Sequence, residues 1–171
     1  MKKLFVSAVL ACLLAASSAL AAEKHVYVDP DSPKYTNKEY GFVLTLPPGQ
    51  WGGYLMEDRS GVRFSDAAVG DEEYTEVRAY AFPRRKAAFA HLFAAEAKGY
   101  MEILKEEKSP REDWFAITAL SPRGWHVYVR YYIGKDAVNV LAVSSAPGQK
   151  PTFDYTVPAV VRAFRPGFGR K

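Results

Sequence analysis

The fold is indicated most clearly by the stretch GWHVYVRYYI at positions 124–133. Its side chains alternate in character, which is typical of a β-strand whose two faces have different surroundings. One face, the natural core side, carries Trp125, Val127, Val129, Tyr131 and Ile133. The other face carries His126, Tyr128, Arg130 and Tyr132. The stretch therefore predicts a long strand of a sheet that packs against a core on at least one face.

Further strands are expected on both sides of this stretch. The segments Ser121-Pro122-Arg123-Gly124 and Gly134-Lys135-Asp136 have the composition of hairpin connections. Short apolar runs bounded by turn residues predict the other strands. They cover residues 41–46, 51–56, 61–65, 74–82, 114–120 and 137–144.

Two helices are expected, and each follows a change in the spacing of apolar residues. After Pro83, the apolar residues of the segment 84–107 recur at helical spacing. Near the C-terminus, Phe153, Val160 and neighbouring apolar residues suit an amphipathic helix, in which Pro158 requires either a start near Thr156 or a kink. The chain is therefore expected to be α+β, with an antiparallel sheet of about six or seven strands flanked by a long central helix and a C-terminal helix.

The N-terminus has the composition of a secretory signal peptide. Lys2 and Lys3 precede an uncharged apolar run at 4–14, and Ala19-Leu20-Ala21 supplies the small residues of a cleavage site. We expect cleavage after Ala21, with Ala22 as the second choice, and an exported, periplasmic mature protein. Since no later segment is apolar over the length of a bilayer, no membrane span is expected.

Cys12 is the single cysteine of the chain. Val9 and Ala11 match the residues that precede a lipid-modified cysteine, but the bulky Leu10 between them does not, and apolar sequence continues after Cys12. We therefore expect signal cleavage to remove Cys12 rather than a lipid anchor to form on it. The mature chain then has no disulfide, no thiol nucleophile and no thiolate metal ligand.

The length and charge of the mature chain favour one ordinary domain. We expect a signal peptide at 1–21, an N-terminal extension at 22–39, one domain at 40–166 and a basic tail at 167–171. Without Lys2 and Lys3, 21 basic residues stand against 19 acidic ones, a net charge of +2. This near balance does not indicate a general nucleic-acid-binding protein.

Three segments carry a resemblance to a known family. They are the opening strand with its proline at 40–47 and Trp51, the segment 130–132 in a late strand, and the closing region with 146–147 and 160–166. In these segments the chain resembles the PsbP-like family, which includes an extrinsic photosystem II protein, a Ran-binding import factor and bacterial exported proteins. The resemblance implies an antiparallel sheet with flanking helices and no shared enzymatic activity.

Motifs with a recognised chemistry are missing from the sequence. There is no nucleophile elbow, phosphate-binding glycine loop or zinc-protease pair. His25, His91 and His126 have no ligand-like spacing, and the acidic run 71–73 lacks the alternating carboxylates of a calcium loop. We therefore expect no catalytic residue, no metal and no cofactor.

The candidate binding surface is the polar and aromatic side of two strands. In the segment 74–82, Arg78 and Tyr80 oppose an apolar face, as the polar residues do in 124–133. If the two strands were neighbours, tyrosines and arginines would stack across the sheet. The expected surface comprises Arg78, Tyr80, His126, Tyr128, Arg130 and Tyr132. Under the alternative interpretation, a helix or loop covers this side and the tyrosines serve packing.

The leading functional hypothesis is an exported, non-enzymatic binding or accessory protein that acts through a protein partner. Its basis is the family resemblance, the missing catalytic motifs and the aromatic and arginine-rich strand face, because interface centres are rich in such residues. One alternative is a small-ligand carrier with an aromatic pocket between sheet and helix. A less favoured alternative is an enzyme whose site is assembled from distant residues.

Overall fold

The structure is a computed structural model. It describes residues 25–26, 29, 33–56, 60–67, 71–85 and 88–168. The expected signal peptide and Cys12 lie outside the described residues.

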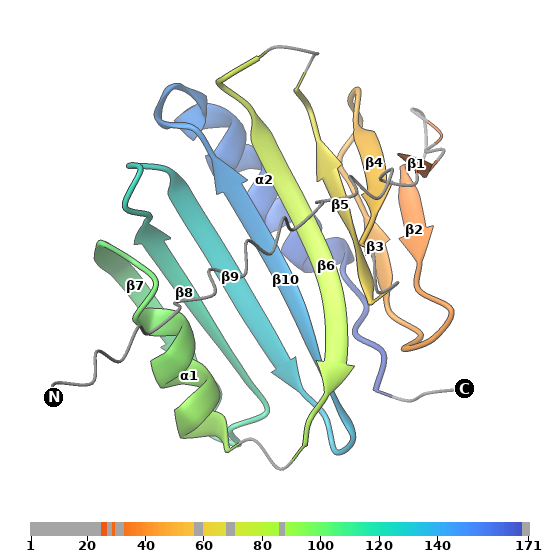
Figure 1. Cartoon of the computed structure of the whole chain (residues 1–171), viewed down its shortest axis with the longest axis vertical. Coiled ribbons are helices and arrows are strands. Elements are labelled where there is room, and N and C mark those ends of the chain that lie inside the picture. Colours follow the sequence, from red (N-terminus) through yellow and green to blue (C-terminus); the bar gives the residue numbers. More distant parts are fainter. Residues whose placement is uncertain are drawn as a thin grey trace, which may run out of the picture.

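The centre of the fold is one large antiparallel sheet (Figure 1). Among the described residues it contains eight strands in the order β1-β4-β5-β6-β10-β9-β8-β7. Their bounds, in that order, are His25–Val26, Gly52–Leu55, Gly61–Ser65, Thr75–Pro83, Ala137–Ser145, His126–Ile133, Trp114–Leu120 and Glu102–Lys108. A second sheet pairs β2 (Lys34–Thr36) with β3 (Val43–Thr45). The described part of the expected extension 22–39 thus takes part in both sheets.

The two expected hairpin connections are present around β9. Antiparallel pairing joins β8 to β9 and β9 to β10. Gly124 has φ of 76°, a left-handed conformation that glycine adopts without steric cost. The amide of Gly134 donates to the carbonyl of Ala137 at 2.9 Å, which closes the second turn. Turn chemistry therefore sets the register of the central strands.

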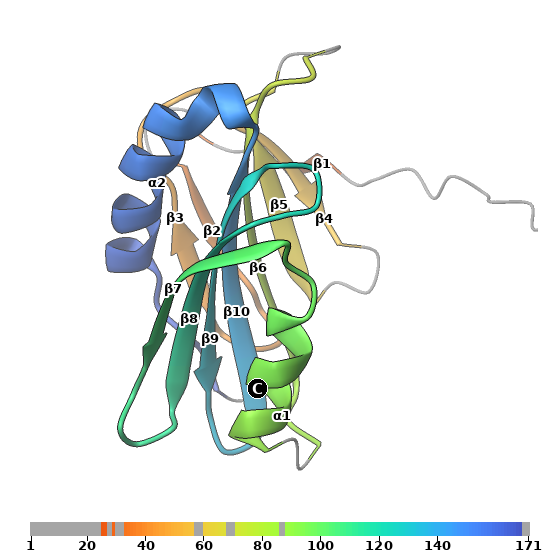
Figure 2. The same ribbon diagram turned by 90° about the vertical axis from the view of Figure 1, so that its left-hand side faces the viewer.

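One face of the sheet is covered by α2 (Lys150–Ala163) and the small sheet (Figures 1 and 2). Phe42 and Leu44 of the small-sheet hairpin and Phe153 and Val160 of α2 join one buried cluster with residues of β5, β6 and β10. We call this the α2 face. Burying these side chains provides most of the driving force on this side, at about 2–3 kcal/mol for each large apolar side chain.

The opposite face is covered in part by α1 (Phe89–Ala97), which lies on the other side of the sheet from α2 (Figure 2). We call it the α1 face. Phe89 and Phe93 pack edge-on against Phe115 at ring-centre distances of 5.5 and 5.3 Å, and Phe115 stacks on Tyr131 at 4.6 Å. This second cluster lies over β8, β9 and β10. The α2 face and the α1 face thus each have a core, and the α+β class is confirmed.

The long central helix expected over 84–107 is wrong. The helix ends at Ala97, and Glu102–Lys108 is strand β7, paired with β8. Pairing satisfies the backbone groups that β8 would otherwise expose at the sheet edge, which outweighs local helix propensity. Ile103 and Leu104, which completed the helical pattern, are 37% and 50% exposed. The helical spacing of apolar residues over 84–107 therefore extended across two elements, α1 and β7.

The C-terminal helix begins at Lys150, so a start near Thr156 is wrong and Pro158 lies inside the helix. The chain after it is held by the core. Arg165 exchanges two backbone hydrogen bonds of 2.9 Å with Val43. The buried amide of Asn139 donates to the carbonyl of Gly167 at 2.7 Å and accepts from its amide at 3.2 Å. The expected tail 167–171 therefore begins with docked residues; residues 169–171 lie outside the described range.

Candidate functional site

The six residues of the expected binding surface lie on two strands that are not neighbours. Strand β10 separates β6 from β9, with Leu141 facing both Ala79 and Arg130. Side chains directly opposite one another in a ladder share a face of the sheet. By this register Arg78 and Tyr80 lie on the α1 face, whereas His126, Tyr128, Arg130 and Tyr132 lie on the α2 face. The expected stacking across neighbouring strands does not occur.

Three of the four residues on β9 pack against the covering layer. The ring of His126 lies 5.7 Å from that of Phe153 in α2, and the ring of Tyr132 lies 5.3 Å from that of Phe164. Tyr128 is only 6% exposed. Packing therefore explains the burial of Tyr128 and one ring contact each of His126 and Tyr132. This agrees with the alternative interpretation, in which these side chains serve packing.

Arg130 is held differently, by aromatic rings. Its guanidinium carbon lies 4.0 Å from the ring centre of Trp114 and 4.9 Å from that of Tyr132. Its Nε is buried without a hydrogen-bond acceptor, and no ion pair in the described part of the chain includes Arg130. Partly buried cations are usually paired with a carboxylate. Here the guanidinium lies against the faces of two aromatic rings instead.

The pKa values of the two phenols beside Arg130 are shifted by the same surroundings. Burial raises the pKa of Tyr128 above its ordinary value, and the nearby charge of Arg130 opposes this increase. Burial also raises the pKa of Tyr132, again against the effect of Arg130. Both phenols therefore remain protonated near neutral pH, and the positive charge of this cluster is that of Arg130.

On the α1 face, Arg78 belongs to an ion-pair cluster. The Glu76 carboxylate is 4% exposed and accepts a hydrogen bond from Nε of Arg78. Its second oxygen lies 3.6 Å from Nε of Arg63, on the neighbouring strand β5. Arg63 also lies over the ring of Tyr54, 5.1 Å from the ring centre. A single buried carboxylate thus positions two guanidinium groups.

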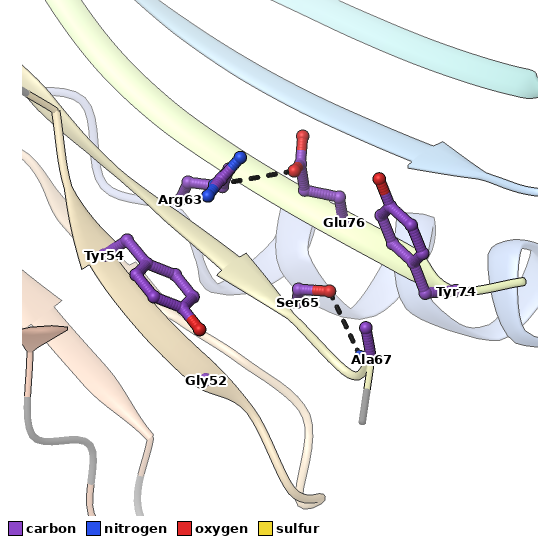
Figure 3. Close-up of a pocket in the computed structure, with 7 residues that line it drawn as sticks. All are labelled: Gly52, Tyr54, Arg63, Ser65, Ala67, Tyr74 and Glu76. Atoms are coloured by element: carbon purple, nitrogen blue, oxygen red, sulfur yellow. Dashed lines mark hydrogen bonds and ion pairs between the residues drawn. The ribbon is translucent and has the colours of Figure 1, made fainter. Parts of the chain in front are cut away.

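A hollow of about 210 Å³ opens beside this cluster (Figure 3). It lies over β4, β5 and the start of β6. Its lining residues are Gly52, Tyr54, Arg63, Ser65, Ala67, Tyr74 and Glu76. Its lining combines the Arg63–Glu76 pair with three hydroxyl-bearing side chains.

The space between sheet and α1, where a carrier pocket was considered, is occupied by aromatic contacts. Tyr100 and Tyr131 both donate hydrogen bonds from their hydroxyls to the Glu96 carboxylate on α1. Burial raises the pKa of both phenols, and the bonds to Glu96 raise it further. These phenols stay protonated at neutral pH, so they act here as donors that attach α1 to the sheet.

No group of three or more metal-ligating side chains occurs in the described ranges. His91 on α1 and the acidic residues 71–73 are solvent-exposed. Within the same ranges, no helix is long and apolar enough to cross a membrane.

Sequence reasoning did not single out Trp114, Glu76 or Arg63. Trp114 begins a strand that was expected, but its contact with Arg130 depends on β8 pairing with β9. Glu76 falls two residues before Arg78, on the same strand face, and this spacing was the available signal for an ion pair within the strand.

Comparison of the sequence with protein-family models gives no match, and comparison with curated proteins gives none either.

Proposed function

We propose that this protein is an exported, non-enzymatic binding or accessory protein of the cell envelope that acts through a protein partner. The observation that carries the proposal is the guanidinium of Arg130, stacked on Trp114 and without an ion-pair partner in the described residues. Tryptophan and arginine are the residue types most enriched at the energetic centres of protein interfaces. Trp114, Arg130 and Tyr132 together form what we call the Arg130 stack.

The chemistry of the Arg130 stack favours an acidic group on the partner. The rings hold the guanidinium plane but leave its charge without a carboxylate. A partner carboxylate can accept two parallel hydrogen bonds from one guanidinium, and the aromatic surroundings exclude water from that contact. All three side chains of the stack are partly exposed. The proposed contact is therefore an aspartate or glutamate side chain of a protein partner.

Membership of the PsbP-like family is part of this proposal. It is supported by the segments that resemble the family and by the antiparallel sheet with a helix on each face, the arrangement that the resemblance implies. The absence of a shared enzymatic activity in that family favours a binding role. Export is likewise proposed, with cleavage after Ala21; protein sequencing of the periplasmic form should begin at Ala22, and a form that begins at Met1 would contradict it.

Partner capture tests the proposal. The mature chain, immobilised, should retain a partner from an envelope extract. Arg130→Gln should reduce that retention by about tenfold or more, the effect of losing roughly 1.4 kcal/mol at an interface centre. The expected binding surface also includes Tyr128, but this side chain is buried, so its substitution would affect folding as well as binding.

The matched control is Arg162→Gln, which removes the same charge from an exposed position on α2. Circular dichroism spectra of the two variants should match that of the unaltered chain. If Arg130→Gln and Arg162→Gln retain the partner equally well, the Arg130 stack is not the binding surface.

A further inference from the structure

The large sheet ends in a long edge at β7. Figure 2 views the molecule from this edge, with α1 and α2 to either side of it. Among the described residues, β7 pairs with β8 on one side and with no strand on the other. The strand at the opposite end of the sheet, β1, has two residues, whereas β7 has seven. The outer side of β7 therefore presents a row of backbone groups to which a further strand can be added.

Apolar side chains are exposed at the same edge. Met101, Ile103 and Leu104, at the start of β7, are 62%, 37% and 50% exposed. Burial of apolar surface favours association between chains, and grouped apolar side chains on a surface mark sites of interaction. A strand added along β7 covers part of this apolar surface.

The ladder with β8 determines which backbone groups of β7 point outward. The amide of Ser109 donates to the carbonyl of Trp114 at 3.0 Å, so the backbone groups of Ser109 point toward β8. Successive residues of an antiparallel strand point alternately toward one neighbouring strand and away from it. The amides and carbonyls of Glu106 and Lys108 therefore point away from β8. An added strand would bind these groups.

The side chains of β7 carry charges of both signs on both faces. By the register with β8, Lys105 and Glu107 lie on the α2 face, and Glu106 and Lys108 lie on the α1 face. Nζ of Lys105 lies 3.1 Å from the Glu107 carboxylate, and Nζ of Lys108 lies 3.2 Å from that of Glu106. Charges on an edge strand usually discourage pairing with other chains. Here the order of the charges is one that a second copy of β7 can match.

The matching register follows from the backbone. An antiparallel second copy must bring outward-pointing residues opposite one another, which a two-fold axis at Glu106 does. Lys105 of each copy then lies opposite Glu107 of the other, at the positions where cross-strand side chains are closest. The two Glu106 residues meet at a more widely spaced position, and Lys108 lies beside each. A shift of two residues places Lys105 opposite Lys105 in one direction and Glu107 opposite Glu107 in the other.

We propose that this protein forms a two-fold dimer in which β7 pairs antiparallel with β7 of a second copy, centred on Glu106. The pairing joins the two large sheets into one continuous sheet. Both α2 faces lie on the same side of it, because the two-fold axis is perpendicular to the sheet. The dimer goes beyond the proposed function and does not depend on it, since the Arg130 stack requires no second copy.

Sedimentation equilibrium of the mature chain over a concentration series tests the dimer. The unaltered chain should show a monomer–dimer equilibrium. Lys105→Glu and Glu107→Lys should each weaken the dimer by about tenfold or more, because the two-fold axis creates two like-charge contacts in each case. When the two variants are mixed, they should form a mixed dimer in which both contacts again join opposite charges. Loss of the ion pair within one strand does not explain such a recovery.

The matched control mixture is Lys150→Glu with Asp154→Lys. These variants reverse the same charges in an exposed ion pair on α2. Alone and mixed, they should dimerise as the unaltered chain does. If this mixture gains association as the β7 mixture does, general attraction between unlike net charges explains the result and the proposal is wrong.

Two variants at Glu106 test the backbone contact. Glu106→Pro removes an amide that points away from β8 and should abolish the dimer, whereas the fold tolerates proline at such an edge position. Glu106→Thr keeps the amide and removes the like charges at the axis, so the dimer should persist. Circular dichroism spectra of both should match that of the unaltered chain. Equal association of the two variants would overturn the proposal. An unaltered chain that stays monomeric throughout the series would also overturn it, and would leave the edge to a strand of a different protein.

Discussion

The protein holds arginine side chains in two ways on the two faces of one sheet. On the α2 face, Arg130 lies on the rings of Trp114 and Tyr132. On the α1 face, Arg63 and Arg78 share the buried carboxylate of Glu76. In the first arrangement the charge is oriented but not neutralised. In the second, one buried carboxylate lies against both guanidinium groups and fixes their positions.

This difference separates what each cluster does for the fold from what it offers to a ligand. An aromatic stack contributes about 0.5–2 kcal/mol and leaves the charge of the cation without a carboxylate partner. A buried carboxylate with charge-assisted hydrogen bonds contributes more to the fold, and its removal takes a charged partner away from two cations. We therefore expect stability to depend more on Glu76, and partner binding more on Arg130.

The largest expected effect is that of Glu76→Gln. The substitution removes the negative charge between two arginines and should lower the free energy of unfolding by about 2 kcal/mol. The cost stays below the roughly 3–5 kcal/mol of a fully buried pair, because Arg63 and Arg78 are 35% and 50% exposed. Urea denaturation measures it. Glu102→Gln, at an exposed position of β7, is the matched control and should change little. Equal stability of the two variants would show that Glu76 does not organise the arginines.

The next effect is the coupling between Arg130 and Trp114. A double-mutant cycle with Arg130→Lys and Trp114→Leu should give a coupling free energy of about 1 kcal/mol, because lysine keeps the charge but loses the planar stack. The same cycle with Arg63→Lys and Tyr54→Leu should give about half as much, since Arg63 lies farther from its ring. A larger coupling at Arg63 than at Arg130 would contradict the distinction between the two arrangements.

The sequence predicted which side chains of a strand share a face of the sheet. It did not predict which strands lie next to one another. The alternation in 124–133 correctly separates Val129 and Tyr131 from Tyr128 and Arg130, because side-chain direction in a strand follows from the backbone alone. The position of β10 between β6 and β9 depends on long-range pairing, which no local pattern records. The expected joint surface of Arg78 and Arg130 failed for this reason.

The Arg130 stack and the Glu76 ion-pair cluster also depend on contacts that residue type alone does not predict. Arg130 was expected at a binding surface, but its contact with Trp114 requires strand β8 to be in register. Glu76 was not singled out from the sequence, yet its side chain is only 4% exposed and lies against both Arg63 and Arg78. The helix expected over 84–107 failed because β7 gains hydrogen bonds from β8, a gain that spacing within 84–107 does not show.

The smallest expected effect concerns the tyrosines beside each arginine. Burial holds the pKa of Tyr128 and Tyr80 above the ordinary value of 10.0, and Arg130 and Arg78 respectively oppose that increase. For a phenol whose folded pKa is raised, the stabilising contribution is complete below pH 10.0 and is lost as the pH rises through the folded pKa, because the unfolded chain ionises first. Removing the positive charge should therefore raise the phenol pKa further and delay tyrosinate formation.

The delay should be larger for Arg130→Gln than for Arg78→Gln. The charge of Arg130 is the main influence opposing burial at Tyr128, whereas at Tyr80 the effect of Arg78 is smaller than that of burial and of the Glu96 carboxylate. Ultraviolet absorbance of tyrosinate during an alkaline titration of the folded chain measures both, with Arg162→Gln as the control. The reverse order would mean that the Arg130 charge is already neutralised within the protein. The Arg130 stack would then have no unmet charge to offer to an acidic partner.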